Sequence, residues 1–501
     1  MPDVVVVGGG SAGCVAAAGF ARAGASVMLL EAGSTTMALL SDPGLSMTEL
    51  TDARRLPIGP SSRYVDPITT RVDGARDVVG TRGRVLGGSS AVNGAYFVRA
   101  PLADFARWPR DRWSADVVAE GFRRIETDLD LGDRPGHGTD GPMPVSRAVV
   151  APVADAFRRA ATAAGHRDLD DLNAADAGDG VGAVPSNVAG GRRVSAAEAF
   201  LAPVAGLVEV RGEAVVARVD VVAGRVVGVS GRDKHGAFTV GADRVILAAG
   251  TVRTATVLMH SGIGPRETLR GIGVDVVVDR PGVGVGVGDH PEVAVAYRPP
   301  EVAEAYRPRR VAQTWRTPLE VVLEAGPVEL RCYSTSFDRL IDGVPPGDPV
   351  IGVAAMVAEP LGSVVPLSAD PFAAPRVDHP VADADRRALV DGVALAHDLL
   401  GRPEMAEVVD HVTTALDAPL PPGAALHTVG SARMGADDDP FAVVDSSCRV
   451  FGVSGLAVVD ASMFPAVPTR GPHATVIMAA HRATEMLVAE ADRSAAVRRG
   501  R

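Results

Sequence analysis

The sequence predicts an α/β fold of two domains: a Rossmann-type dinucleotide-binding domain and an interleaved substrate domain built on an antiparallel sheet with helices. Three observations lead to this prediction. The chain opens with a strand–glycine turn–helix pattern. Its 501 residues exceed the usual size of one domain. Apolar segments typical of central strands recur as late as residues 456–460, so pieces of the two domains must alternate along the chain.

The opening unit is the clearest element. Residues 3–7 are β-branched on both faces, as in a buried parallel strand, and a helix over Ala12–Ala23 and a strand over Ser26–Glu31 follow. Glu31 stands eighteen positions after Gly13, at the distance of a ribose-binding acid. A pyrophosphate would rest on the helix N-terminus, where glycines let the backbone approach it. The turn residues expected to contact the dinucleotide are Gly8, Gly10, Ser11, Ala12 and Gly13.

The remaining elements are expected in chain order. Helix-like stretches lie around Phe105–Trp113 and Val117–Thr127, and Val208–Val229 alternates like a hairpin with Ala223-Gly224 as its turn. Further strands are expected at 245–249, 328–332, 350–357, 363–367 and 456–460, and helices at 385–400 and 475–490.

A second glycine-rich block spans Arg82–Gly94. Such a loop can run along an extended flavin and offer backbone donors to it, which favours FAD over NAD. The alternative is an ordinary strand–turn–helix connection. The residues of this block expected to bind the cofactor are Arg82, Gly87, Gly88, Ser89, Asn93 and Gly94.

Composition narrows the class of protein. The formal charge of −11 argues against nucleic acid as the main partner, because phosphate binding needs a basic surface. Cys14, Cys332 and Cys448 are too scattered for a metal-ligand spacing or a disulfide framework, so we expect no metal site and a reducing, cytoplasmic location. No uninterrupted apolar stretch is long enough to span a bilayer, and we expect at most peripheral association with the inner face of the cell membrane.

Two histidines near the end of the chain are the strongest candidates for chemistry. His473 stands just before a helix whose N-terminus would favour negative charge opposite it. A neutral imidazole, with a reference pKa near 6.5, is suited to accept a hydroxyl proton, and His427 fits this role as well. Each histidine, taken singly, also fits a surface or core position. We interpret His290 and His481 as structural.

Taken together, these residues resemble the glucose–methanol–choline (GMC) oxidoreductase family of FAD enzymes over nearly the whole chain. The motifs that carry the resemblance occur in a specific order and spacing. They are Gly8–Gly13 with Glu31, Arg82–Gly94, Gly250–Thr254, Ser261–Pro265, Pro281–Gly284, Gly288–Pro291, His427–Gly435 and Val459–Ser462.

The resemblance implies oxidation of an alcohol to a carbonyl, with the hydride passing to N5 of FAD. His427 matches the family's catalytic base, and His473 matches a second active-site position that holds the substrate oxygen. Some members tether FAD through a histidine where this chain has Val92, which implies non-covalent FAD. The other positions that match cofactor contacts are Val216 at the adenine, Asp460 and Ala461 near the pyrophosphate and ribityl chain, and Thr475 in the last helix. The expected FAD-binding domain comprises residues 1–100, 178–292 and 428–501, and the substrate-binding domain comprises 101–177 and 293–427.

Shorter phrases resemble a narrower group, the actinobacterial GMC enzymes of the mycofactocin system. These phrases are Gly180–Asn187, Asp437–Pro440, Arg470–Thr475 and His481–Ala483. The similarity implies that the donor is reduced mycofactocin (mycofactocinol) and that electrons pass toward the respiratory chain. A GMC alcohol oxidase or choline-dehydrogenase-like enzyme that uses a small alcohol with dioxygen or a quinone would share every family motif. A catalytically silent flavin-binding module is the third reading, and the presence of both histidines argues against it.

Overall fold

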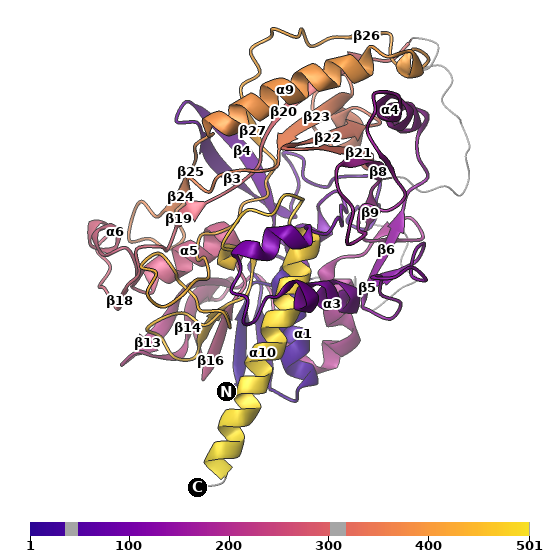
Figure 1. Cartoon of the computed structure of the whole chain (residues 1–501). Coiled ribbons are helices and arrows are strands. Elements are labelled where there is room, and N and C mark those ends of the chain that lie inside the picture. Colours follow the sequence, from indigo (N-terminus) through magenta and orange to yellow (C-terminus); the bar gives the residue numbers. More distant parts are fainter. Residues whose placement is uncertain (36–48, 301–316, 500–501) are drawn as a thin grey trace.

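A five-stranded parallel sheet forms the base of the molecule in the computed structural model, which describes residues 1–35, 49–300 and 317–499 (Figure 1). All four residues of its central strand are buried, which explains why valine occupies both faces. The strand order is β12-β2-β1-β16-β28, with β1 at Val4–Val7, β2 at Val27–Leu30, β12 at Val208–Arg211, β16 at Arg244–Leu247 and β28 at Leu456–Val458.

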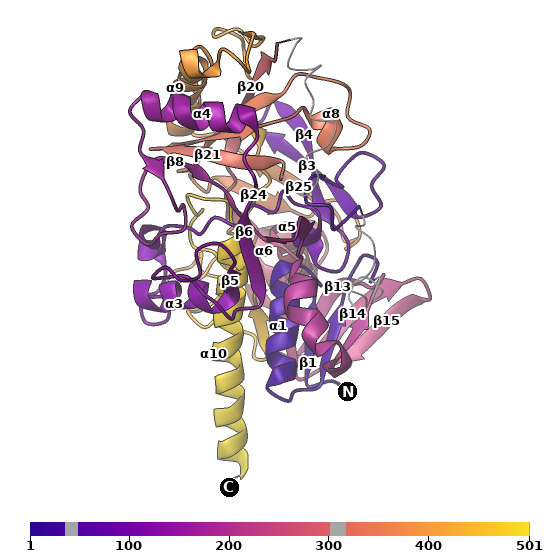
Figure 2. The same ribbon diagram turned by 90° about the vertical axis from the view of Figure 1, so that its right-hand side faces the viewer.

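The first and last helices of the chain lie side by side against this sheet (Figures 1 and 2). Helix α1 spans Ser11–Arg22 and helix α10 spans His473–Arg499. They approach closely at Gly19, where a Cβ would lie 2.5 Å from Cγ2 of Thr484. A small residue is therefore required at this crossing.

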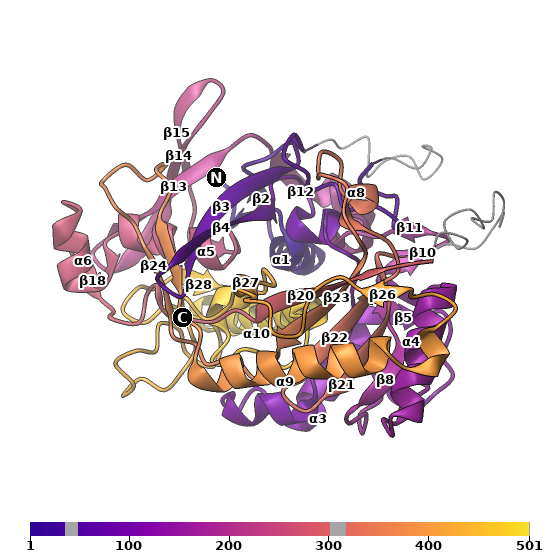
Figure 3. The same cartoon turned by 90° about the horizontal axis from the view of Figure 1, so that it is seen from above.

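A second sheet of eight strands forms the upper part of the molecule. Helices α4 (Pro152–Ala163) and α9 (Asp383–Leu400) cover one of its faces and share a hydrophobic core with it (Figures 1 and 3). The strand order is β26-β20-β23-β22-β21-β8-β7, with β27 also paired to β20. The bounds are β7 Asp168–Leu169, β8 Gly180–Ala183, β20 Pro291–Arg298, β21 Leu319–Ala325, β22 Val328–Tyr333, β23 Val350–Ala355, β26 His411–Val412 and β27 Gly423–Ala424.

Smaller sheets and helices connect these two layers. One sheet has the order β19-β24-β25-β3-β4 and another the order β13-β14-β15. Their strands are β3 Val65–Val72, β4 Arg76–Gly83, β13 Val215–Val222, β14 Arg225–Asp233, β15 Gly236–Gly241, β19 Val285–Val287, β24 Gly362–Val365 and β25 Arg376–His379. The connecting helices include α3 at Ala115–Ile125 and α5 at Thr251–His260. No helix within the described ranges combines the length and hydropathy needed to cross a membrane.

Most expected elements are confirmed, including the opening unit and the late strand β28 that completes its sheet. The single hairpin expected over Val208–Val229 is wrong in part. Residues Val208–Arg211 form β12, which pairs in parallel with β2, while the hairpin is β13–β14 with the expected turn at Ala223-Gly224. The stretch expected near Phe105 is a 3₁₀ helix over Leu102–Arg107. Alternation along β12 resembles that of a hairpin strand, and only the distant partner β2 distinguishes the two.

The domain boundaries expected from the sequence remain a prediction, and several strand pairings cross them. Strands β24 and β25 lie in the range 293–427 assigned to the substrate-binding domain, but they pair with β19 and β3 of the expected FAD-binding domain. Strand β8 lies in the range 178–292 assigned to the FAD-binding domain, but it pairs with β21 in the eight-stranded sheet. The sequence motif there, rich in glycine and valine, does not reveal which sheet receives it.

The turn after β1 gives a test of the fold. A Cβ on Gly13 would lie 1.8 Å from the carbonyl oxygen of Gly8, so Gly13→Ala must push the turn away from α1. We expect a loss of about 3 kcal/mol or more in the free energy of unfolding, measured by denaturant titration. The control Gly206→Ala, where a Cβ meets no atom within 4 Å, should leave that free energy nearly unchanged. Equal stability of the two variants would contradict this account of the turn.

Candidate active site

Two histidine rings meet where the eight-stranded sheet begins. The Nδ1 atoms of His290 and His427 lie 2.9 Å apart, and Nε2 of His290 lies 2.9 Å from the carbonyl oxygen of Pro468. A carbonyl only accepts hydrogen bonds, so Nε2 of His290 carries a proton. Burial lowers the pKa of His290 to about 4, so the ring is neutral and its Nδ1 accepts. His427 must then donate from Nδ1, which leaves its Nε2 as the proton-accepting atom.

The carboxylate of Asp289 fixes the backbone on both sides of this pair. One oxygen accepts the backbone N–H groups of His290 and His427, each at 2.8 Å. The other accepts the hydroxyl of Thr428 at 2.7 Å, and that hydroxyl accepts an N–H of Arg82 at 2.6 Å. The second glycine-rich block is thereby connected to the histidine pair.

His473 is the first residue of α10, two positions after Gly471, which adjoins the ring of His427. The edge of Phe97 packs on its ring, with centroids 5.3 Å apart, and burial lowers its pKa to about 4. A Cβ on Gly471 would lie 2.9 Å from Cδ1 of Tyr96 and 3.7 Å from Cε1 of His427. His427 and His473 therefore lie on neighbouring segments, and both imidazoles are neutral at pH 7.

A buried charge network lies beside the histidine pair on the eight-stranded sheet. The Arg331 guanidinium pairs with Glu329 and Glu292, and Glu329 accepts the hydroxyl of Tyr96. Burial, together with the positive charge of Arg331, lowers the pKa of His427 well below its usual range. The imidazole of His427 is therefore neutral at pH 7, with an unprotonated ring nitrogen.

The two glycine-rich segments touch each other. The backbone N–H of Gly87 donates to the carbonyl of Gly9 at 2.7 Å, and a Cβ on Gly88 would lie 2.6 Å from Cα of Gly10. The Glu31 carboxylate accepts the N–H groups of Gly9 and Gly33, both at 2.7 Å. Burial raises the pKa of Glu31 to about 7. The cofactor residues expected in the segments 8–13 and 82–94 therefore lie close together.

The other expected cofactor residues are placed differently. The Asp460 carboxylate accepts the N–H of Gly250 and the hydroxyl of Thr254, at 2.8 and 2.7 Å, so its side chain ties α5 to the last strand. The Ala461 carbonyl accepts the N–H of Gly430. Val216 lies on β13, two residues after Ala214, whose N–H donates to the backbone carbonyl of Glu31. Within the second block, the side chain of Asn93 accepts the N–H of Ala95, that of Ser89 accepts the N–H of Gly83, and Gly94 adjoins Leu56.

These surroundings fit an FAD. Helix α1 begins after Gly10 without a side-chain cap and without an acidic residue in its first turn, so its N-terminal amides suit a pyrophosphate. Nε2 of His473 and Oγ1 of Thr475 are buried and find no hydrogen-bond partner among the residues that the structure describes. Buried polar atoms require partners, and a flavin with its substrate would supply them.

The sequence leads us to interpret His290 as structural, and the structure adds a contact that the sequence does not reveal, the hydrogen bond between its Nδ1 and that of His427. The signal was the pair Asp289-His290 directly before a strand whose side chains alternate, but a lone histidine in a loop gives no indication of its partner. His481 lies on α10 near Glu485, at 4.0 Å, and no contact with the histidine pair is found in the described ranges.

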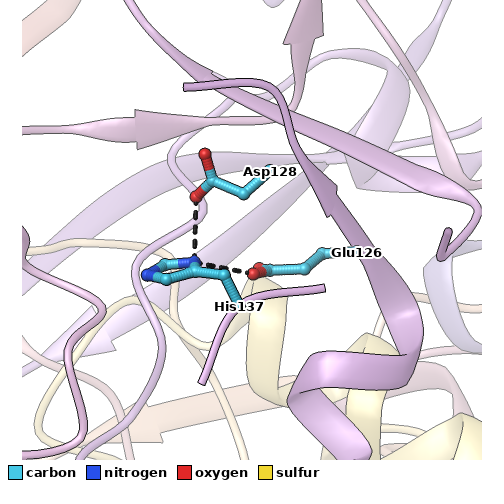
Figure 4. Close-up of side chains that lie close together, drawn as sticks. All are labelled: Glu126, Asp128 and His137. Atoms are coloured by element: carbon cyan, nitrogen blue, oxygen red, sulfur yellow. Dashed lines mark hydrogen bonds and ion pairs between the residues drawn. The ribbon is translucent and has the colours of Figure 1, made fainter. Parts of the chain in front are cut away.

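A separate ionic cluster supports the wall behind His473. Glu126, Asp128 and His137 are buried, and in the part of the chain described they form the one group whose ligand-type atoms all lie within 4.8 Å (Figure 4). Nε2 of His137 also lies 2.9 Å from Asp171. The cations of this cluster are His137, Arg99 and Arg147, and they match the three carboxylates in number. This balance favours an ion cluster over a metal site, and the absence of a metal remains a prediction.

The cluster connects to the active-site wall through one asparagine. Asp171 accepts the N–H of Asn173 at 2.9 Å, and the Asn173 side chain binds the N–H of Arg99 and the carbonyl of Phe97 at 2.8 and 3.2 Å. Phe97 is the residue that packs on His473. The charges at His137 therefore help to hold the ring behind the site.

This cluster predicts a pH-dependent stability. Burial alone would lower the pKa of His137, but hydrogen bonds to Asp128, Asp171 and Glu126 raise it to about 10. A raised histidine pKa stabilises fully below its unfolded value of about 6.5, and the stabilisation disappears as the pH rises to about 10. The destabilisation of His137→Gln relative to wild type should therefore be largest near pH 6 and decrease toward pH 10, as measured by urea unfolding. The exposed His411→Gln should differ little from wild type at every pH. A difference for His137→Gln that does not vary with pH would contradict this reading.

Comparison with known proteins agrees with this geometry. Residues 2–292 and 358–480 match the two models described as GMC oxidoreductase. The chain is 41% identical to a GMC-type oxidoreductase in the thcA 5′ region of Rhodococcus erythropolis, over 97% of this chain and 98% of that one. It is 30% identical to the oxygen-dependent choline dehydrogenase of Vibrio vulnificus, over 97% and 94%. Pyridoxine 4-oxidase from Mesorbium loti has a TM-score of 0.83 and 25% identity, over 96% and 98%. The chain therefore belongs to the GMC oxidoreductase family and is an FAD-dependent oxidoreductase.

Proposed function

We propose that this protein is an alcohol dehydrogenase in which His427 removes the hydroxyl proton of the donor. The observation that carries the proposal is the hydrogen bond between the Nδ1 atoms of His427 and His290. Because His290 donates its other N–H to a carbonyl, neutral His427 presents Nε2 as an acceptor. A base with a fixed tautomer is ready before the donor binds, so no reorientation is needed.

In the proposed reaction, the donor hydroxyl lies between His427 and His473. Nε2 of His427 accepts the hydroxyl proton as the C–O bond becomes a carbonyl. Nε2 of His473 supplies a hydrogen bond that holds the oxygen, which fits its present lack of a partner. Bound FAD supplies the two-electron acceptor for the hydride from the carbinol carbon. Asp289 holds the backbone of His427 and so helps to fix the position of its ring.

The residues proposed to hold FAD are those of the two touching glycine segments and their neighbours. Glu31 would bind the ribose, and the α1 N-terminus would receive the pyrophosphate. The proposed contacts are Gly8, Gly10, Ser11, Ala12, Gly13, Glu31, Arg82, Gly87, Gly88, Ser89, Asn93, Gly94, Val216, Asp460, Ala461 and Thr475. For Asp460 the contact would come from its backbone, because the carboxylate is fully used within the protein. Val92 offers no atom for a tether, so we propose that FAD is bound non-covalently.

We further propose that the donor is mycofactocinol and that electrons pass toward the respiratory chain. Support comes from the short phrases shared with the mycofactocin-linked group and from the chemistry, since an activated secondary alcohol is a good hydride donor. The proposed location is the cytoplasm or the inner face of the cell membrane.

A small cationic alcohol is the second candidate donor, with dioxygen or a quinone as acceptor. It is favoured by the similarity to the choline dehydrogenase and by Glu292. This glutamate follows His290 by two positions on β20, and its side chain keeps 26% of its surface accessible. A partly accessible carboxylate two positions after His290 would attract a cation.

A panel of donors under anaerobic conditions distinguishes these candidates. The holoenzyme would be mixed with mycofactocinol, choline and simple primary alcohols while the flavin absorbance near 450 nm is followed, a region typical of oxidised flavin. We expect mycofactocinol to bleach the flavin fastest. Faster bleaching by choline, followed by rapid oxygen consumption on aeration, would replace the first candidate with the second. Failure of every donor would indicate a flavin-binding module without this activity.

His427→Ala tests the base. The variant should retain FAD but reduce it about 10²–10⁴-fold more slowly in a single turnover, because a general base is lost. The control His481→Ala removes a histidine from the middle of α10 and should reduce FAD at the wild-type rate. Unchanged flavin reduction in His427→Ala would rule out the proposed role.

A further inference from the structure

A segment far along the chain packs against the second glycine-rich block. Ser195 lies against Gly87, where a Cβ would come within 3.1 Å of the serine Cβ. The N–H of Ala196 donates to the hydroxyl of Ser90 at 2.9 Å, and that hydroxyl donates to the carbonyl of Gly87 at 2.6 Å. We call residues Arg193–Ala196 the bracket segment. It packs against the second glycine-rich block at Gly87 and Ser90.

The guanidinium of Arg193 reaches further than the rest of this segment. The residue is 1% exposed, and its N–H groups donate to the carbonyls of Leu50 at 2.6 Å, Ala91 at 3.5 Å and Arg55. The backbone N–H of Arg193 also donates to the carbonyl of Thr51 at 2.8 Å. One side chain thus connects residues 50–55, the second glycine-rich block and the bracket segment.

Residues 50–56 form a cover over the second block, and we call them the cover segment. Leu50 shares a small apolar cluster with Ala91 and Val92, and Ala53 shares another with Ala95. The two clusters are small, so apolar packing alone gives the cover segment little stabilisation. The arginine adds charge-assisted hydrogen bonds to this weak packing.

The chemistry of Arg193 is unusual for a residue that only fills space. A buried guanidinium is costly unless its N–H groups find acceptors. Here Nη1 and Nη2 donate to the backbone carbonyls of Leu50, Ala91 and Arg55, while Nε has no partner among the described residues. No ion pair between Arg193 and a carboxylate is present in the described ranges. Burial lowers the pKa of Arg193 to about 10, and the negative charges of Asp52 and Glu198 oppose this shift. Five donors in a planar fork allow arginine, unlike a hydrophobic residue, to join several backbone segments.

We propose that Arg193 is a positioning residue that retains FAD by fastening the cover segment to the second glycine-rich block. The inference rests on the FAD site proposed above. Because Gly88 of that block touches Gly10 of the opening turn, movement of the block would open the cradle on which FAD rests. Without a covalent tether, the lifetime of the complex depends on such walls.

The test compares FAD release from the holoenzyme in wild type, Arg193→Met, Arg193→Lys and the surface control Arg266→Met. Arg266 pairs with Asp279 and is 47% exposed, so its loss should leave FAD binding unchanged. The measurement is the rise of free flavin fluorescence after dilution, together with the thermal midpoint with and without added FAD. Arg193→Met should release FAD about tenfold or more faster, since charge-assisted hydrogen bonds are lost. Arg193→Lys keeps the charge but has fewer donors and a shorter reach, so its release rate should lie between those of Arg193→Met and wild type.

The two measurements separate cofactor retention from general stability. If Arg193 retains FAD, the increase in thermal midpoint that FAD produces should shrink in Arg193→Met, and saturating FAD should restore the bound-flavin spectrum. If Arg193→Met gives no folded protein, the release rate of Arg193→Lys decides. Wild-type release rates in the folded variants, or an equal fall of the midpoint with and without FAD, would overturn the proposal. Neither result depends on which donor reduces the flavin, so the proposed function could fail while this inference stands.

Discussion

The carboxylate of Asp289 is the group on which the site depends. It accepts hydrogen bonds from the backbone of His290, at the start of the eight-stranded sheet, and from the backbone of His427. His427 lies 138 positions after Asp289 along the chain. Through Thr428 it also reaches Arg82 of the second glycine-rich block. One buried carboxylate therefore orients three distant parts of the sequence. The hydrogen bonds that it accepts offset the cost of removing it from water.

The two sheets explain why these parts meet. Strand β20 begins two residues after Asp289, and the segment after His427 returns to the parallel sheet through backbone hydrogen bonds to Ala461, Ser462 and Met463. A histidine in this position belongs to neither layer alone. At this junction, charges from the antiparallel sheet, such as that of Arg331, lower the pKa of His427. The ring meanwhile stays near the glycine segments proposed to receive the cofactor.

How far the sequence predicts this structure depends on the range of each interaction. The opening unit is predictable because the contact of Gly13 with Gly8 is local and excludes any side chain. The pairing of β12 with β2 is not, because residues 208–211 carry the same alternation as a hairpin strand and their partner lies about 180 residues earlier. His427 could be proposed from its motif, whereas the role of His290 depends on a hydrogen bond across 137 positions. The ion cluster at His137 was likewise beyond sequence reasoning, since its carboxylates come from separate loops and strands.

The position of β28 has a consequence for how the protein is made. The parallel sheet needs residues 456–458 as an outer strand, and α1 packs against α10, which starts at residue 473. A ribosome must therefore translate at least residues 1–473 before the first βαβ unit acquires these two neighbours. Domains of many proteins fold one after another as they emerge from the ribosome. Here the sheet that contains the opening βαβ unit is complete only after β28 has been made. The face of α1 that packs against α10 therefore stays uncovered until α10 has been made.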